Sequence, residues 1–376
     1  MEVKFDEETG FEVFKIIGDL WKEKRDIFGG VVLPQDRYVP KIYDDKNYAN
    51  WLFYAALPMR GGLISEDPFK WLLALWESFP EMFDPKSISE KWSPEKIGEA
   101  FRLVTPAILK GNGTGEKGGA GALSYKMGEH PKAWYENSLT LHRYWGGDIR
   151  NVFWGCLDFE EAFRRIDYYK SEVGFKGMRR KIFSLLVIWL QEKKVISVFP
   201  TPIPIDFHAL RVMIATGIIR FEKVAKPFVR KNEKHPLQLE GKLSLRISER
   251  FIDAVAKWTQ KFLWKSRLSH LEVNPGLWVL SRNLCAEHFQ TSARKGRKSF
   301  VEADDLLAGS WPKTYKNPCG YCPIENHCKW IIPSAPYYQW GLLIRLGERV
   351  SYPVNQLPGI DWTKFIPYKP RKNSRR

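Results

Sequence analysis

Three of the chain's five cysteines lie within ten residues, in the segment NPCGYCPIENHCKW at positions 317–330. Cys319, Cys322 and Cys328 form a C-x2-C-x5-C pattern, and Cys285 precedes them with 33 residues between. Clustered thiols in a chain without secretory features indicate a metal centre rather than a disulfide scaffold. Four thiolates suit either zinc or an iron–sulfur cluster, so the sequence predicts one of these two.

Two further residues bear on the ligand set. His327 adjoins Cys328, and both side chains would struggle to reach one metal. Cys156 lies far upstream of the cluster, and we expect it to be a buried core cysteine. The four clustered or neighbouring cysteines therefore stay the expected ligands.

The charge of the chain indicates a polyanionic partner. Its 376 residues carry 59 Lys and Arg against 43 Asp and Glu, a formal net charge of +16. Lys and Arg side chains that neutralise phosphates release counterions, which favours nucleic-acid binding. No apolar stretch is long enough to span a membrane and no signal peptide begins the chain, so we expect an intracellular protein of the cytoplasm or nucleoid with no membrane partner.

Hydrophobic periodicity indicates a mainly α fold. Residues 182–190 are apolar on every side and predict a central buried helix. β-Branched alternation is found only in short pieces such as residues 195–198. The other helices are predicted at residues 12–26, 50–57, 68–78, 94–109, 131–144, 159–172 and 206–215, with two long ones across 248–268 and 276–288.

The segment CGYCPIENHC (319–328) resembles the four-iron, four-sulfur cluster loop of the endonuclease III and MutY-type DNA glycosylases, members of the helix-hairpin-helix superfamily. The spacing of its three cysteines is the same, and LWVLSRNLC (277–285) is similar to the helix that ends on the family's first ligand. The interval after that first ligand is longer here. The resemblance implies a 4Fe-4S cluster, with zinc as the alternative, held by Cys285, Cys319, Cys322 and Cys328.

A second stretch, FKGMRRKIF (175–183), is similar to the family's hairpin L-P-G-V-G-x-K-T-A. Gly177 matches the first glycine, and Arg179 stands in place of the second. A hairpin glycine lets the backbone approach a phosphate, and the next helix presents its amides to that anion. Arg179 and Arg180 would add charge-assisted contacts to the DNA. The resemblance implies that Lys181 attacks the sugar and forms a Schiff base, which allows β-elimination.

A third stretch, PIPIDFHALR (202–211), is similar to the family's V-D-T-H-V-x-R, with Phe207 in place of the threonine. Asp206 follows a proline-stiffened segment and precedes apolar residues at helical spacing, which predicts a helix N-cap. The resemblance implies that this carboxylate stabilises positive charge on the sugar as the base departs. We expect His208 and Arg211 to orient the turn.

An early segment, NWLFYAALPMRGG (50–62), resembles the family's first helix and the loop that enters the DNA. Enzymes that extrude a nucleotide fill the hole with inserted side chains. Met59 and Arg60 are the candidates for this role.

The resemblance implies a two-domain helix-hairpin-helix DNA glycosylase fold with a 4Fe-4S cluster loop, mainly α. We expect the pocket between the domains, with Lys181 on one side and Asp206 on the other. The expected segments are an N-terminal helix (1–46) that packs with the cluster domain, a six-helix domain ending in the hairpin (47–198), the iron–sulfur cluster domain (199–335), and a C-terminal extension with a basic tail (336–376).

Together these features predict a DNA repair glycosylase. It would bind double-stranded DNA containing a lesion or mismatch as a monomer, flip the base and cleave its N-glycosidic bond, with AP-lyase activity through Lys181. One alternative is a monofunctional glycosylase in which Asp206 activates water. The other is a non-catalytic iron–sulfur nucleic-acid-binding protein on the same scaffold.

Overall fold

The computed structural model describes residues 3–59, 66–109, 129–168, 171–221, 230–232, 235–240, 242–245, 249–281, 322–328, 343–344 and 350–353. Contacts within the chain divide it into two compact units, Val32–Pro204 and the pair Met1–Val31 with Ile205–Arg376. Across the described residues the protein is mainly helical, as expected. No helix in this part of the chain has both the length and the apolar character that crossing a bilayer requires. The assignment of the four expected segments to domains stays a prediction.

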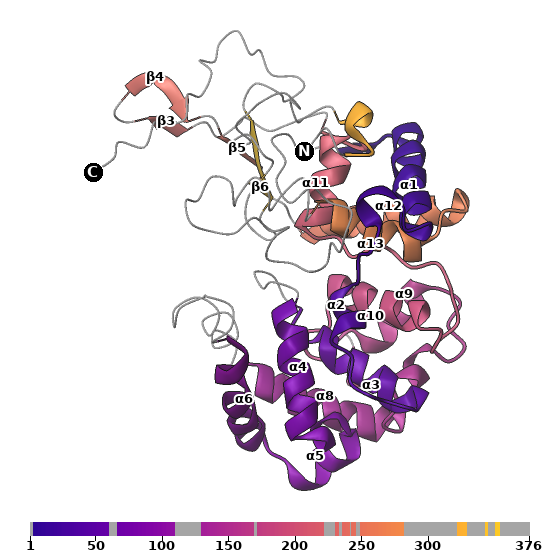
Figure 1. Ribbon diagram of the computed structural model, residues 1–376, viewed down its shortest axis with the longest axis vertical. Helices are drawn as coiled ribbons and strands as arrows, with labels where there is room; N and C mark the ends of the chain where they lie inside the picture. Colours follow the sequence, from indigo (N-terminus) through magenta and orange to yellow (C-terminus); the bar gives the residue numbers. More distant parts are fainter. Residues whose placement is uncertain are drawn as a thin grey trace. The chain divides into compact units, whose positions relative to one another are not determined.

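The unit Val32–Pro204, called the hairpin unit below, is built of helices (Figure 1). Helix α3 is buried along most of its length and packs against α10, which carries the predicted buried stretch. The prediction of a buried helix at residues 182–190 is confirmed, although Leu185 is only partly buried. The elements are α2 (Pro34–Arg37), α3 (Asp45–Ala56), α4 (Glu66–Ser78), η2 (Pro80–Phe83), α5 (Pro85–Lys91), α6 (Pro94–Leu109), α8 (His130–Trp145), η3 (Ile149–Phe153), α9 (Phe159–Ile166) and α10 (Arg180–Glu192).

Aromatic side chains form the centre of this unit. Trp134 stacks on Tyr54 at 4.3 Å between ring centroids and meets the edges of Phe83 and Phe101. The indole N–H of Trp134 donates to the Met82 carbonyl at 2.9 Å, so the ring is satisfied at its polar end as well. Aromatic pairs in these geometries add stability beyond their buried area. Rings from α3, α6 and α8 therefore hold this helical unit together.

The second unit, called the cap unit below, joins the N-terminus to the C-terminal half. Strand β1 pairs antiparallel with β2, and the Asp6 N–H donates to the Ile218 carbonyl at 2.9 Å, so the start of the chain is fastened to the end of α11. Two further antiparallel sheets have the strand orders β3-β4 and β5-β7-β6. The elements are β1 (Val3–Phe5), α1 (Glu7–Lys22), η1 (Asp26–Phe28), α11 (Phe207–Ala215), β2 (Ile219–Phe221), β3 (Arg230–Asn232), β4 (His235–Glu240), β5 (Lys242–Leu245), α12 (Glu249–Lys265), α13 (His270–Leu280), η6 (Glu325–His327), β6 (Leu343–Ile344) and β7 (Val350–Pro353).

Several boundaries differ from those expected. Helix α1 spans Glu7–Lys22 rather than residues 12–26, and α3 begins at Asp45 rather than at residue 50. Helix α9 ends at Ile166 rather than at residue 172, and residues 195–198 form no strand because α10 closes there with the Val195 N–H on the Leu190 carbonyl. Helix α13 begins at His270 and continues through Pro275, whereas we expected the helix to start after that proline. A proline removes one intrahelical hydrogen bond, and here tertiary packing of α13 outweighs this loss.

Close packing of α13 against α1 depends on Gly276. A Cβ atom at this position would overlap the Ile17 side chain and lie 3.2 Å from the Ile17 carbonyl oxygen. Gly18, on α1, differs because a Cβ there would meet Val273 at 3.5 Å, an ordinary contact. The contact between α1 and α13 therefore excludes a Cβ atom at Gly276 and tolerates one at Gly18.

We expect Gly276→Ala to destabilise the protein by about 1–3 kcal/mol, because the added methyl group forces the helices apart. Gly18→Ala is the matched control and should be neutral or stabilising, since alanine favours a helix interior. Urea unfolding of both variants measures the difference. Equal stability of the two would show that α1 and α13 are not packed this closely.

Candidate functional site

The predicted hairpin is a turn between α9 and α10. Gly177 has φ +80°, a left-handed conformation that favours glycine. Phe175 and Met178 on either side of it are buried, and Phe175 packs against Phe53 at 4.8 Å between ring centroids. Helix α10 then starts at Arg180, and within the described residues no side chain caps its first turn. The turn thus presents a glycine and a helix N-terminus together, a combination suited to an anion.

A buried asparagine holds this turn. Asn137 on α8 is 1% exposed; its Oδ1 accepts from the Lys176 N–H at 2.7 Å and its Nδ2 donates to the Lys176 carbonyl at 3.0 Å. Glu136 forms an ion pair with the Lys176 ammonium at 2.9 Å. Helix α8 therefore fixes the peptide that precedes Gly177. The sequence does not reveal this role of Asn137, because a single asparagine carries no signal of a partner 39 residues away.

The two hairpin arginines differ in environment. Arg180 forms a bidentate ion pair with Glu160 of α9, and its guanidinium lies 4.7 Å from the Phe163 ring centroid. Arg179 is exposed. Lys181 lies half-buried one residue into α10. Arg180 therefore braces α9 against α10, and its predicted phosphate contact would compete with Glu160.

The prediction that Asp206 caps a helix is confirmed. Its Oδ1 accepts from the backbone N–H groups of His208 at 2.9 Å and Ala209 at 3.1 Å at the start of α11. Its Oδ2 accepts no hydrogen bond from the described residues. The carboxylate is half-buried, so one oxygen is fixed by the helix and the other can face a ligand.

His208 and Arg211 converge on a single hydroxyl. His208 Nδ1 lies 3.2 Å from Ser281 Oγ, and Arg211 Nη1 donates to the same oxygen at 3.4 Å. The three residues are 6%, 3% and 0% exposed. Ser281 ends α13 and precedes Cys285 by four residues, so α11 is bound to the segment that leads to the first expected ligand. Ser281 carries no signal of this role in the sequence, although it lies within the stretch LWVLSRNLC (277–285).

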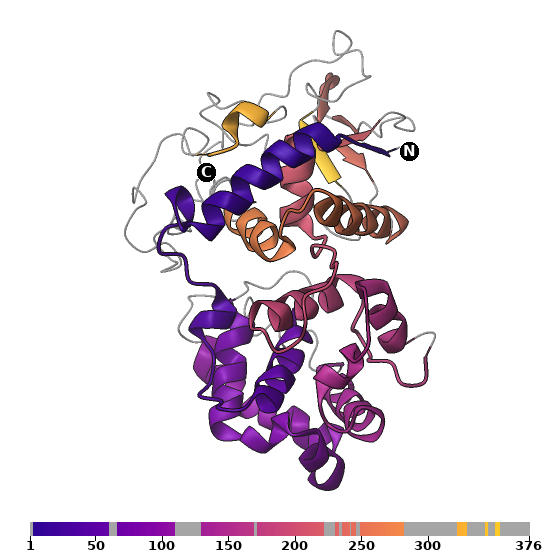
Figure 2. The same ribbon diagram turned by 90° about the vertical axis from the view of Figure 1, so that its right-hand side faces the viewer.

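The cysteine loop is described only from Cys322 to Cys328. Both cysteines are half-buried and flank η6, in which the Glu325 N–H donates to the Cys322 carbonyl and the Cys328 N–H to the Glu325 carbonyl, each at 3.0 Å. His327 Nδ1 lies 3.4 Å from a Glu12 carboxylate oxygen, which attaches the loop to α1 (the gold turn in Figure 2). His327 therefore lies against the carboxylate of Glu12, and the thiols of Cys322 and Cys328 are the soft metal donors of this turn.

Cys285, Cys319 and Arg60 lie outside the described residues, so the complete ligand set and half of the expected wedge stay predictions. In the described part of the chain no group of three or more His, Cys, Asp or Glu residues is arranged to hold a metal ion. The two thiols on one turn fit a sulfur-ligated cluster and fit zinc equally well. Cys156 is half-buried against the core, where burial raises the pKa of its thiol.

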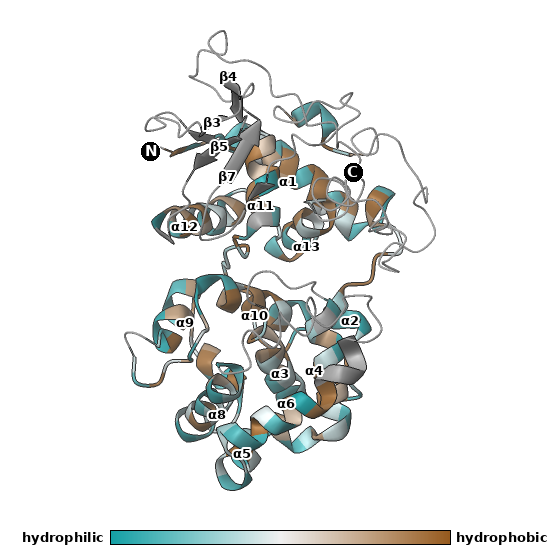
Figure 3. Ribbon diagram, turned by 90° about the vertical axis from the view of Figure 1, so that its left-hand side faces the viewer, coloured by the Kyte–Doolittle hydropathy of each residue, from teal (hydrophilic) through white to brown (hydrophobic). Residues whose placement is uncertain are grey.

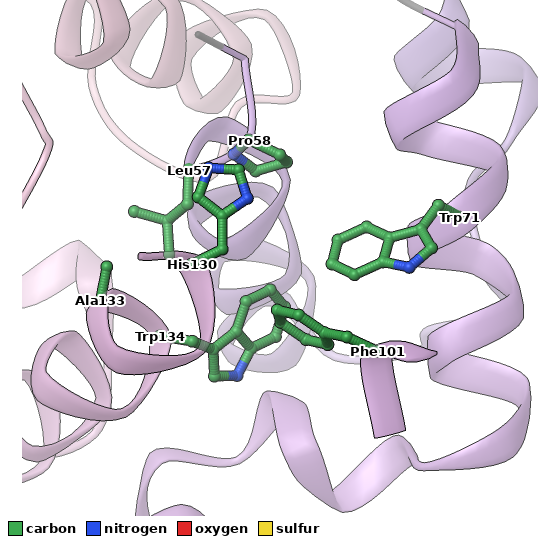
Figure 4. A pocket seen from close by; sticks show the side chains of 7 residues that line it. All are labelled: Leu57, Pro58, Trp71, Phe101, His130, Ala133 and Trp134. Carbon is green, nitrogen blue, oxygen red and sulfur yellow. The ribbon is translucent and has the colours of Figure 1, made fainter. Parts of the chain in front are cut away.

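A small hollow lies beside the predicted wedge, where Leu57 and Pro58 precede the half-buried Met59. Figure 4 shows the rings of Trp71 and His130 on opposite sides of the hollow and those of Phe101 and Trp134 near its floor. The empty volume of about 280 Å³ includes open solvent, and the enclosed part has room for about one water molecule. In this form the hollow does not receive a flipped base.

No model of a known protein family matches the chain, and no curated protein is significantly similar to it. The likeness to helix-hairpin-helix glycosylases therefore rests on the quoted sequence stretches alone and stays an expectation. Lys181 belongs to the hairpin unit and Asp206 to the cap unit.

We expect Asn137→Ala to lower the free energy of unfolding by about 1–3 kcal/mol and to weaken DNA binding, because the Lys176 peptide loses both partners. Asn50→Ala is the matched control: Asn50 is equally buried and holds the Gly147 carbonyl and the Ile149 N–H of another loop. The control should lose similar stability and keep its DNA affinity at fixed salt. Equal loss of affinity in both variants would refute a role of Asn137 in positioning the hairpin.

We expect Ser281→Ala to destabilise the protein by about 1–3 kcal/mol, because His208 and Arg211 lose their shared buried partner. Thr259→Val is the control, since the buried Thr259 hydroxyl donates to the Ala256 carbonyl of its own helix. Chemical denaturation should show a loss below about 1 kcal/mol for the control. A Ser281 variant as stable as the control would contradict the convergence described above.

Proposed function

We propose that the protein is a DNA repair glycosylase that flips a damaged or mismatched base from duplex DNA and cleaves its N-glycosidic bond. The observation that carries the proposal is the carboxylate of Asp206, which is tied to the first turn of α11 through Oδ1 while Oδ2 accepts no hydrogen bond from the described residues. Departure of a base leaves positive charge on the sugar, and a fixed carboxylate oxygen stabilises that charge without having to reorient.

Buried support distinguishes Asp206 from two other aspartates that cap helices, Asp84 and Asp158. Asp84 uses both oxygens in its cap, and Asp158 caps α9, most of whose residues are only partly buried or exposed. Asp206 instead begins a buried helix that is held by His208 and Arg211 through Ser281. Such support is what a catalytic carboxylate needs to keep one geometry.

The hairpin would bind the DNA backbone. The left-handed Gly177 and the uncapped first turn of α10 supply backbone amides for a phosphate, and the exposed Arg179 supplies charge. The net charge of +16 supports the same partner by favouring counterion release.

Lys181 is the proposed nucleophile of a lyase step. Its amine would attack the anomeric carbon as the base leaves and form a Schiff base, and β-elimination would then break the strand. Without this step the enzyme would be monofunctional, and Asp206 would activate a water molecule.

Cys285, Cys319, Cys322 and Cys328 would hold a 4Fe-4S cluster, whose contribution when bound is to fix the loop rather than to take part in the reaction. The tie between Ser281 and α11 supports this structural role, since it links the segment before Cys285 to the helix that Asp206 caps.

The test is Asp206→Asn, assayed on a panel of lesion-bearing and mismatched duplexes. An amide can still cap α11, so the fold and DNA binding should persist while base release falls at least about 100-fold. Asp158→Asn is the control, because Asp158 also caps through one oxygen, from the Glu161 N–H at 2.9 Å. Unchanged turnover in the Asp206 variant would exclude the proposed mechanism. A wild-type protein that binds the panel and cleaves none of it would be the non-catalytic binder.

Borohydride trapping tests the lyase step separately. Wild-type protein should become covalently attached to its substrate DNA, and Lys181→Ala should remove this adduct. Arg179→Ala serves as the comparison, since it should weaken binding and still allow trapping at saturating protein. An adduct that survives in the Lys181 variant would assign the Schiff base to another amine.

A further inference from the structure

Helix α12 has a core face and an outer face. On the core face Trp258 stacks on Phe5 of β1 at 4.6 Å and on Phe262 at 4.7 Å, and Phe262 meets Phe14 of α1 edge-on. Val255 is fully buried on the same face. The helix is coloured in mixed teal and brown bands in Figure 3, as expected for an element with one apolar and one polar face.

The outer face carries cations and one tryptophan. Lys257, Lys261 and Trp264 stand at positions i, i+4 and i+7, which places them on one side of the helix, and Lys265 adjoins them. All four side chains are exposed, and Trp264 is 59% exposed. We call these four residues the α12 basic face.

The charges of this face are not balanced as they are on other helices. Lys15 is paired with Asp19 on α1 and Lys86 with Glu90 on α5, each at i,i+4. Beyond Asp253 helix α12 contains no acid, and Lys257 and Lys261 form no ion pair with any described residue. Lysines at i,i+4 repel one another and destabilise a helix, so the arrangement opposes stability.

Trp264 adds an independent observation. Among the described tryptophans, Trp154 and Trp264 are exposed (81% and 59%), and the Trp264 ring lies in line with two lysines that form no ion pair with a described residue. Aromatic rings beside a track of cations are typical of surfaces that stack bases while the cations follow the phosphates. Successive lysines at i,i+4 are about 6 Å apart along the axis, which suits neighbouring phosphates.

We infer that the α12 basic face binds single-stranded nucleic acid. Lys257, Lys261 and Lys265 contact consecutive phosphates, and the Trp264 ring stacks on an unpaired base. The surface uses neither Asp206 nor Lys181, so it stands whether or not the protein is a glycosylase. Lys265 also lies 3.4 Å from Glu7, an exposed pair that a phosphate can replace.

The experiment measures binding of the full chain to single-stranded oligothymidine, which contains no lesion, as a function of salt. For Lys257→Gln/Lys261→Gln the slope of log K against log salt should become shallower by about 1.4, the value for two phosphate contacts on a single strand. Lys15→Gln/Lys22→Gln is the control with the same change in charge, because both lysines already face acids, Asp19 and Glu272. Equal slopes in the two double variants would overturn the inference.

Trp264→Ala separates stacking from charge. It should lower affinity about tenfold while the salt slope stays that of the wild type, and it should remove part of the fluorescence quenching on binding. Affinity and quenching equal to those of the wild type would overturn the stacking role.

Lys261→Glu separates folding from binding. A carboxylate four residues after Lys257 and four before Lys265 replaces repulsion between lysines by attraction, so Tm should be equal to or above that of the wild type while oligothymidine binding falls. Unchanged oligothymidine binding in this variant, combined with lost binding to vesicles containing phosphatidylserine, would overturn the inference and assign the face to an anionic lipid surface.

Discussion

In the cap unit, two buried side chains share one buried hydroxyl, that of Ser281. Arg211 is charged and almost fully buried, so it requires a fixed partner, and Ser281 supplies one while also receiving His208. This convergence binds α11 to α13, and Gly276 lets α13 lie against α1. Glu12 of α1 then reaches His327 between the two described cysteines. Asp206 and the cysteine loop are thus parts of one packed framework, although each is near the surface.

In the hairpin unit, buried side-chain amides hold the backbone of two turns. Asn137 and Asn50 are both buried, and each hydrogen-bonds one backbone N–H and one backbone carbonyl of a turn. Asn137 binds both groups of Lys176, and Asn50 binds the Gly147 carbonyl and the Ile149 N–H. A side-chain amide can donate and accept at once, so it can hold a backbone carbonyl and a backbone N–H of the same turn. Turns held in this way can keep glycines at positive φ next to a helix start, the geometry that an anion site needs.

The sequence predicted features that depend on local chemistry. The Asp206 cap and the buried α10 follow from proline, capping and apolar spacing, and they are confirmed. Ser281 and Asn137 could not be predicted, because their partners are 70 and 39 residues away and their residue types are common. Helix α13 continues past Pro275 because tertiary packing outweighs a local breaker. The cluster ligands Cys285 and Cys319 stay predictions.

Cations that are paired with acids contribute to the fold of this protein, whereas cations without such pairs are available to a partner. Arg180 is committed to Glu160 and Lys176 to Glu136, so these hairpin cations first serve the fold. Both pairs are partly buried, and each neutralises its cation locally. A polyanion is attracted most strongly to cations that are not already paired, and on the α12 basic face Lys257 and Lys261 form no ion pair with a described residue. The net charge of +16 therefore does not indicate where a polyanion would bind. A local excess of cations over acids is more informative.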